Sequence, residues 1–329
     1  MSQLITVPSE PVPLPESGSW PATRHEFDEK SIWAILAAVK AKRPLLVRGE
    51  PGTGKSQLAR AAAVYLRRAF IFEVVHARSE CHDLQYHFDA VARLGEAQTL
   101  SVLKKSNEKV EDLLAPKRFI TPGALWWAFD WSGAEDQYEI GNKAARRPER
   151  PTKWCPQWQP DNGTALLIDE IDKADADLPN GLLETMGNGA FAVPYMDNPV
   201  RMDKKAPPPL VVITTNEERE LPVAFIRRCL VLHLKLKEDP QELIQWLCRR
   251  GEVHFGKACG DVVRKEAAEQ LVEDRIAAKK LNLPVPGQAE YLDMLRAVIG
   301  IAKDNKEEQL NVLKFIRDFA LSKYTDDYR

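Results

Sequence analysis

The chain has 329 residues, of which 44% are hydrophobic, and a formal net charge of −2 at pH 7. This length allows one large domain and a smaller one with a packed core, while the near-neutral charge argues against a general nucleic-acid binder. The five cysteines lack the spacing of a zinc site or disulfide framework, and no signal peptide or membrane-spanning run is present, so we expect a cytoplasmic protein without a membrane partner.

The N-terminal residues 1–22 are rich in proline and poor in apolar periodicity, which predicts a flexible or extended lead-in. A helix is expected over residues 26–42, where Ile32, Leu36 and Val39 recur at helical spacing. We expect an α/β core over 23–236.

Residues 49–56 spell GEPGTGKS, a complete G-x-x-x-x-G-K-[ST] phosphate-binding motif. A short apolar strand precedes it and a helical pattern follows it, which is the context in which such a loop binds phosphate. Glycines allow backbone N–H groups to surround phosphate oxygens, and the helix N-terminus adds partial positive charge. Lys55 is the candidate for contact with the β- and γ-phosphates, and Ser56 is a candidate Mg²⁺ ligand. The predicted nucleotide-contacting residues are Gly49, Glu50, Pro51, Gly52, Thr53, Gly54, Lys55, Ser56 and Gln57.

Residues 165–173, ALLIDEIDK, indicate a buried strand that ends in two acids. Open α/β sheets bind their ligands at the carboxyl ends of the strands. Asp169 is the candidate Mg²⁺ ligand, acting through the metal's water shell, and Glu170 is the candidate base that orients and deprotonates a water. The pair favours hydrolysis over simple phosphate transfer.

Another apolar strand is expected over 210–216 and ends at Asn216, which is a candidate to hydrogen-bond the lytic water or the γ-phosphate. The alternative is that Asn216 merely starts a turn. A short helix in LPVAFIRRC at 221–229 then places Arg227 and Arg228 after the strand. Arginine can stabilise a transferring phosphoryl group, sometimes from a neighbouring subunit, although exposed arginines are more often simply solvated.

Two segments exceed a minimal nucleotide domain: an insertion near 78–160 that is rich in tryptophan, and a hairpin with a proline-rich return near 187–209. Local packing is the ordinary role of such tryptophans, Trp126 and Trp127 included. The alternative is that the insertions bind a partner, in which case one or more of Trp154, Trp158 and Tyr195 is solvent-accessible. Beyond them, residues 237–329 predict four helices that form a C-terminal lid.

The order GEPGTGKS, LLIDEIDKAD, VVITTNEERELP and AFIRRC resembles that of AAA+ ATPases over roughly residues 30–300. The stretches FITPGALWWAFD, ADLPNGLLETMGNGAFAVP and LPVAFIRR resemble the MoxR-type branch. The resemblance implies a P-loop NTPase core with a doubly wound parallel sheet of strand order 5-1-4-3-2 and a helical lid.

The same resemblance implies an enzyme that uses ATP and Mg²⁺, assembles into a ring, usually hexameric, and remodels or matures a client protein. Clients of this branch often contain von Willebrand factor A domains. The family's arginine finger corresponds to Arg228, with Arg227 as its neighbouring alternative. The chain departs from the family where a lid helix usually opens with a sensor arginine: Gln288 stands there, and Arg296 lies about two turns later.

Two other classes stay open at this point. One is a nucleic-acid-linked AAA+ motor or loader of the restriction or defence type, which near-neutral charge disfavours and DNA-stimulated hydrolysis would support. The other is a nucleotide-binding scaffold without turnover, which Lys55, Asp169 and Glu170 disfavour. The motifs do not distinguish ATP from GTP.

Overall fold

The computed structural model describes residues 7–103, 107–141, 147–303 and 305–320. These residues include no helix with the length and apolarity needed to cross a bilayer. The chain divides into two compact units. One contains the residues up to Ile32, Arg48–Leu58 and the residues from His233 onward, and the other contains Trp33–Val47 and Ala59–Leu232. The boundaries expected at residues 22 and 236 stay predictions, because a compact unit is not the same as a separate domain.

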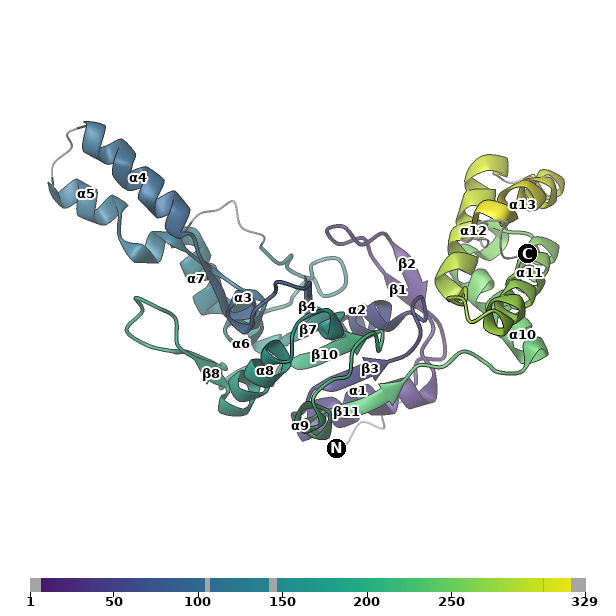
Figure 1. Cartoon of the computed structure of the whole chain (residues 1–329), viewed down its shortest axis with the longest axis horizontal. Helices are drawn as coiled ribbons and strands as arrows, with labels where there is room; N and C mark the ends of the chain where they lie inside the picture. Colours follow the sequence, from purple (N-terminus) through teal and green to yellow (C-terminus); the bar gives the residue numbers. More distant parts are fainter. Residues whose placement is uncertain (1–6, 104–106, 142–146, 304, 321–329) are drawn as a thin grey trace. The chain divides into compact units, whose positions relative to one another are not determined.

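A five-stranded sheet forms the centre of the second unit (Figure 1). Its strand order is β11-β3-β10-β7-β4, and β7 pairs in parallel with both β4 and β10. Numbered along the chain, this order is 5-1-4-3-2, so the predicted sheet order and doubly wound class are confirmed. The strands are β3 (Leu45–Arg48), β4 (Ala69–Val74), β7 (Thr164–Asp169), β10 (Leu210–Thr215) and β11 (Leu230–His233).

The central strands β7 and β10 are buried through nearly all of their length, as expected of strands in a parallel sheet with both faces covered. Leu166, Leu167 and Ile168 are consecutive in β7, so they point alternately to opposite faces, and all three are fully buried. The helices and 3-10 turns near the sheet strands in sequence are α1 (Glu29–Ala41), α2 (Lys55–Tyr65), η2 (Pro160–Asn162), η3 (Ile171–Lys173), α8 (Asp177–Asn188) and α9 (Val223–Arg228).

The insertion near 78–160 is largely helical, and its helix α6 packs on β4 and β7. Trp126 and Trp127 of α6 are buried in the core that also contains the sheet strands, as ordinary packing predicts. The elements of the insertion are α3 (Cys81–Gln85), β5 (Tyr86–Phe88), α4 (Ala90–Leu103), α5 (Asn107–Leu113), η1 (Pro116–Phe119), β6 (Ile120–Pro122), α6 (Ala124–Phe129) and α7 (Trp131–Ile140).

The three aromatic residues expected as accessible differ in exposure. Trp158 is buried, because its ring packs 4.8 Å from that of Trp131 and its indole N–H donates to the carbonyl of Gly163, so it does not meet that expectation. Trp154 is half-buried, while Tyr195 is 57% exposed and confirms the prediction. Tyr195 lies in the predicted hairpin, where β8 (Ala190–Phe191) pairs antiparallel with β9 (Val200–Arg201).

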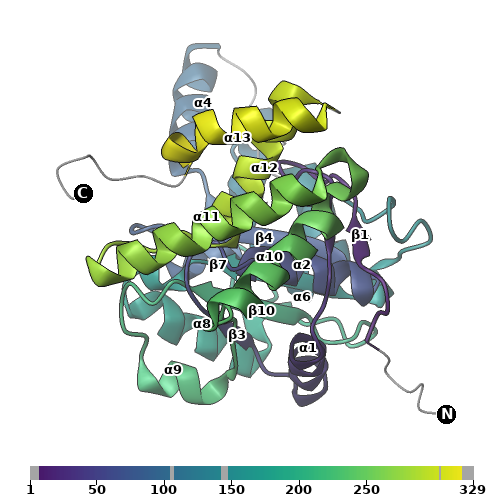
Figure 2. The same ribbon diagram turned by 90° about the vertical axis from the view of Figure 1, so that its right-hand side faces the viewer.

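The C-terminal part of the other unit is helical, with the four helices expected from the sequence (Figure 2). They are α10 (Pro240–Phe255), α11 (Asp261–Lys280), α12 (Gln288–Ala302) and α13 (Lys306–Ala320), with the 3-10 turn η4 (Gly256–Ala258) between the first two. They share a core that includes Leu247, Leu271 and Leu295. Residues 321–329 at the end of the predicted lid lie outside the described residues.

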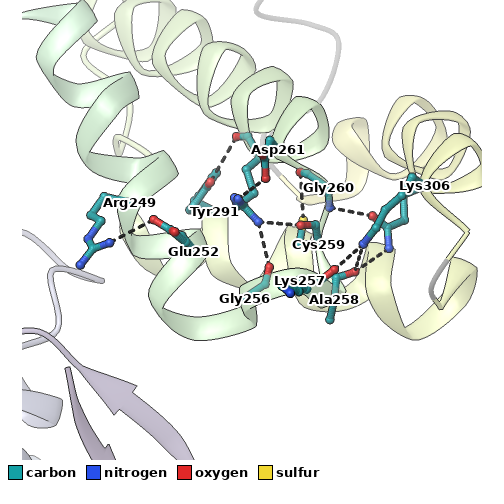
Figure 3. A network of polar contacts seen from close by, with 12 residues as sticks. Arg249, Glu252, Gly256, Lys257, Ala258, Cys259, Gly260, Asp261, Tyr291 and Lys306 are labelled. Atoms are coloured by element: carbon teal, nitrogen blue, oxygen red, sulfur yellow. Dashed lines mark hydrogen bonds and ion pairs between the residues drawn. The ribbon is translucent and has the colours of Figure 1, made fainter. Parts of the chain in front are cut away.

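A polar corner stabilises the turn between α10 and α11 (Figure 3). Arg264, Lys306 and Gln309 donate to backbone carbonyl groups of residues 256–259. Gln309 also accepts from the backbone N–H of Gly260, and the Tyr291 hydroxyl donates to the carbonyl of Arg264. Because unpaired backbone groups are costly when buried, these bonds stabilise the turn on which the helices converge.

The proline-rich N-terminal segment contains a short strand: β1 (Val12–Leu14) pairs antiparallel with β2 (Thr23–His25). The strand β2 packs on α10, where Thr23 hydrogen-bonds His254 at 2.9 Å and Glu26 forms an ion pair with Arg249 at 2.8 Å. Burial lowers the pKa of His25 to about 3 and that of His254 to about 4, and the charge of Arg250 lowers both further. Both rings are therefore neutral at pH 7.

Candidate functional site: a phosphate loop and an acidic strand edge

The phosphate-loop candidate begins at Gly49, directly after β3 ends at Arg48. Its glycines adopt positive φ angles of 152° at Gly49, 73° at Gly52 and 89° at Gly54, a region that side-chain-bearing residues rarely occupy. A Cβ at Gly49 would also lie 2.3 Å from the backbone oxygen of Leu234. The glycines are therefore required by the backbone itself, which curls in the manner of an anion-binding loop.

Lys55 is the first residue of α2 and is mostly buried. Its Nζ donates to the carbonyl oxygens of Gly49, at 2.7 Å, and of Glu50, at 3.0 Å. The Thr53 hydroxyl donates to the same Glu50 carbonyl at 2.9 Å. The ammonium group is thus held within the loop, where a phosphate would compete with the carbonyl groups for its protons.

The other predicted loop residues differ in environment. Ser56 occupies the second position of α2, and Gln57 donates from its side chain to the carbonyl of Arg24 at 3.2 Å. Pro51 is exposed, and the carboxylate of Glu50 pairs with Arg275 of α11. The sequence motif did not predict a partner for Glu50.

The acidic edge lies where β7 and β10 end. A single hydroxyl links both acids: Oγ1 of the buried Thr214 donates to Asp169 Oδ1 at 2.5 Å and accepts the backbone N–H of Glu170 at 2.9 Å. The register explains this contact, because Ile213 pairs with Ile168 and the next residues therefore face each other. Thr214 fixes the direction in which Asp169 leaves the strand.

Glu170 adopts a left-handed backbone conformation with φ 60°, which is uncommon for a residue with a side chain and concentrates at functional sites. Asn216 Nδ2 donates to Glu170 Oε1 at 3.1 Å, and Lys173 Nζ pairs with Oε2 at 2.5 Å. The hydrogen bond to Glu170 raises the pKa of Lys173, so the lysine is protonated at neutral pH. The structure thus brings the predicted base together with the predicted Asn216, and adds Lys173.

The Asp172 side chain holds the backbone at Asn216 in place. This carboxylate is 2% exposed and accepts the backbone N–H groups of Asn216, at 3.4 Å, and of Glu218, at 2.9 Å. It therefore anchors the loop after β10, in which Asn216 lies.

Arg227 and Arg228 end the short helix α9, and both are exposed. The Arg43 guanidinium donates to the backbone carbonyls of both residues, with a distance of 2.9 Å to that of Arg228. A cation at a helix C-terminus satisfies carbonyl groups that lack intrahelical partners. Arg43 thereby fixes the backbone from which both exposed arginine side chains project.

Gln288 is the first residue of α12, and it is buried. Its neighbour Ala289 donates its backbone N–H to the carbonyl of Gly52 at 3.2 Å, so the start of this helix lies against the phosphate loop. Arg296 is exposed and pairs instead with Asp293 of the same helix.

The residues proposed for Mg²⁺ are chemically suitable. Ser56 and Asp169 provide a hydroxyl and a carboxylate oxygen, and Mg²⁺ prefers a few oxygen ligands completed by water and substrate phosphates. A bound Mg²⁺ would neutralise developing charge on the phosphates.

The sequence did not predict Thr214, Lys173, Arg43 or Arg275. Thr214 could have been recognised in the sequence as a polar residue near the end of an apolar strand. Lys173 lies three residues after Glu170, but such spacing is common on solvated turns. Arg43 and Arg275 left none, because their partners lie 185 and 225 residues away in the chain.

The family model for the AAA domain of the dynein-related subfamily matches residues 44–229. No curated protein matches the chain. Among solved structures, a candidate ATPase from Cytophaga hutchinsonii ATCC 33406 is 15% identical, with a TM-score of 0.37, and the match covers 90% of this chain and 88% of that one. A RuvB point mutant from Thermotoga maritima is 14% identical, with a TM-score of 0.38, covering 88% and 75%. Both TM-scores are low, so these likenesses carry no further argument.

Proposed function

Because the chain belongs to the dynein-related subfamily of AAA domains, we propose that it hydrolyses ATP between neighbouring subunits of a ring and uses the resulting conformational change to remodel or mature a partner protein. Within the family, we assign it to the MoxR-type branch on the motifs quoted above. The ring is a hexamer, and the protein acts in the cytoplasm.

The observation that carries the proposal is the arrangement around Glu170. Glu170 follows the carboxyl end of a parallel strand, and its carboxylate contacts the Asn216 amide through one oxygen and Lys173 through the other, which supports the role of a positioned base over that of a solvated turn. Asp169 lies beside it, with its carboxylate fixed by Thr214. A scaffold that only bound nucleotide would have no use for this second, oriented acid.

Each residue then has a chemical role. Lys55 and the loop N–H groups bind the phosphates, while Ser56 and Asp169 hold Mg²⁺. Glu170 accepts the proton of the attacking water, and Asn216 keeps its carboxylate in place.

The exposed arginines support a site completed by a second subunit. Arg228 projects from a backbone that Arg43 fixes, and its side chain is solvent-accessible, as an arginine that stabilises phosphoryl charge in a neighbouring subunit must be. Arg227 has the same backbone support and is the alternative.

The two insertions form the client surface in this proposal. The ring of Tyr195, from the β8–β9 hairpin, lies 5.5 Å from that of Phe88, in the other insertion, so the two segments meet at an aromatic pair in which Tyr195 is exposed and Phe88 is half-buried. Val91 and Leu94 of α4 are also strongly exposed. Aromatic residues are frequent binding hot spots, and a client with a von Willebrand factor A domain is the partner that the MoxR-type branch suggests. Tyr195→Ala should keep basal hydrolysis and lose client binding.

Two substitutions test the chemistry separately. Lys55→Ala should abolish nucleotide binding, because the phosphates lose their main cation. Glu170→Gln should bind Mg²⁺–ATP with parental affinity and hydrolyse it at least about a hundredfold more slowly, because an amide cannot accept the water's proton. Glu220→Gln, on an exposed acid after β10, is the matched control and should hydrolyse ATP normally. Parental turnover by Glu170→Gln would refute the assignment of the base.

A further inference from the structure

Arg275 of α11 connects the lid segment before α12 with the phosphate loop. It is buried, with 7% of its side chain exposed. Its Nη1 donates to the carbonyl of Pro286 at 2.8 Å, and its Nη2 forms an ion pair with the carboxylate of Glu50. A buried guanidinium requires such partners, and here one partner lies on each side of it.

The contact extends beyond the ion pair. Ala289 donates its N–H to the carbonyl of Gly52 at 3.2 Å, and a Cβ at Gly287 would lie 3.2 Å from the carbonyl oxygen of Pro51. Residues 50–52 of the loop therefore run against residues 286–289. Among these contacts, the Arg275–Glu50 pair is the one that joins opposite charges.

Glu50 also contacts Lys55, through its backbone carbonyl group. Its backbone carbonyl accepts from Lys55 Nζ at 3.0 Å, while its carboxylate binds Arg275. A phosphate that draws Lys55 Nζ to itself would weaken the bond to the Glu50 carbonyl. The residue that senses this change is the same one that binds the lid arginine.

We propose that the Glu50–Arg275 pair couples nucleotide binding in the phosphate loop to the lid, with Arg275 as a positioning residue. The inference rests on the proposed function, since it requires that the loop bind a nucleotide. Arg275 keeps its hydrogen bond to Pro286. A shift of Glu50 would therefore act through Arg275 on the position of residues 286–289 and on the start of α12. Arg296, the lid arginine about two turns after Gln288, lacks this geometry because it pairs with Asp293.

The test measures, in the full chain, steady-state hydrolysis of Mg²⁺–ATP and, with and without Mg²⁺–ATP, amide hydrogen exchange of the segment 286–289, in which residues 287–289 carry the amide N–H groups. Glu50→Gln is the main variant, because the 46% exposed Glu50 side chain allows the substitution without disturbing a core. Arg275→Lys is the second variant. Arg296→Lys is the matched control, since it alters a lid arginine whose partner is not in the loop.

Glu50→Gln should raise KM for ATP about fivefold, the loss of one partly buried ion pair, with kcat changed less. It should also remove the ATP-dependent change in exchange at 286–289, whereas Arg296→Lys keeps both parental KM and the exchange change. The double variant Glu50→Gln with Arg275→Lys should be no worse than the poorer single variant, because both changes break the same contact.

Parental KM and parental exchange changes in Glu50→Gln, while the parent binds and hydrolyses ATP, would overturn the coupling and leave the proposed function intact. If the parent binds no nucleotide at all, both proposals fail. A loss of thermal stability in Glu50→Gln with unchanged KM would show that the pair is only structural and would also overturn the inference.

Discussion

The Thr214 hydroxyl offers a quantitative test of how the acidic edge is built. Thr214→Val keeps the side-chain volume and β-branching but removes both bonds of Oγ1, to Asp169 and from the Glu170 N–H. Since Thr214 is fully buried, no water can enter its position to replace the hydroxyl in these two bonds. Leaving the Glu170 N–H unpaired costs about 1–3 kcal/mol, and the loss of the bond to the charged Asp169 carboxylate costs a similar amount. Because Asp169 is half-buried, water can replace part of the second bond.

We therefore expect Thr214→Val to lower the free energy of unfolding by about 2–3 kcal/mol. Urea denaturation followed by tryptophan fluorescence measures this, because Trp126 and Trp127 lie in the same hydrophobic core as the strand residue Ile213. Hydrolysis should also fall, since both acids lose their common support.

The neighbouring Thr215→Val is the matched control. Thr215 is equally buried, but its Oγ1 accepts the N–H of Glu217 instead, so a loss of about 1 kcal/mol is expected. Equal stability and equal hydrolysis for the two valine variants would refute the view that Thr214 holds the acidic pair.

Two further perturbations follow from the same contacts. Arg43→Ala should leave ATP binding unchanged and reduce phosphate release about tenfold or more, because the backbone that carries Arg228 loses its hydrogen bonds to Arg43. Lys42→Ala, which removes the adjacent exposed cation, is the control and should release phosphate at the parental rate. Stability should depend on pH through His25 and His254, whose folded pKa values of about 3 and about 4 lie below the ordinary 6.5. Between the folded pKa values and 6.5, the unfolded chain binds more protons than the folded chain. The contribution of each histidine to the free energy of unfolding is therefore fully present above about pH 6.5, and it falls toward pH 4 by up to about 1.4 kcal/mol per pH unit. Urea titrations between pH 7.5 and 5 measure the slope, which His25→Gln should reduce, and a flat profile would contradict the burial of these rings.

The sheet and its acidic edge were predictable because their signals are local. Each buried strand is a continuous apolar run, and the glycine loop and Asp169–Glu170 follow such runs directly. The strand order came from the family resemblance, and the structure confirms it. Tertiary contacts were less predictable: neither the burial of Trp158 nor the pairing of Arg43 with α9 has a local signal.

The N-terminal segment shows a different limit. Its prolines predict a flexible or extended lead-in, and within it β1, which includes Pro13, pairs with β2. Proline lacks an N–H donor and is tolerated in a two-stranded ribbon, where one edge of the strand needs no partner. The proline content therefore did not indicate that this segment contains a paired strand.

The most direct test of the central claim is phosphate release from mixed subunits of Arg228→Ala and Glu170→Gln. Each variant alone should be nearly inactive, with the arginine loss reducing the rate by roughly 10³ or more. In a co-assembled mixture, some interfaces join an intact Glu170 to an intact Arg228, so the account predicts clear recovery of hydrolysis. A mixture shown to co-assemble that releases no more phosphate than the separate variants would contradict a site shared between subunits.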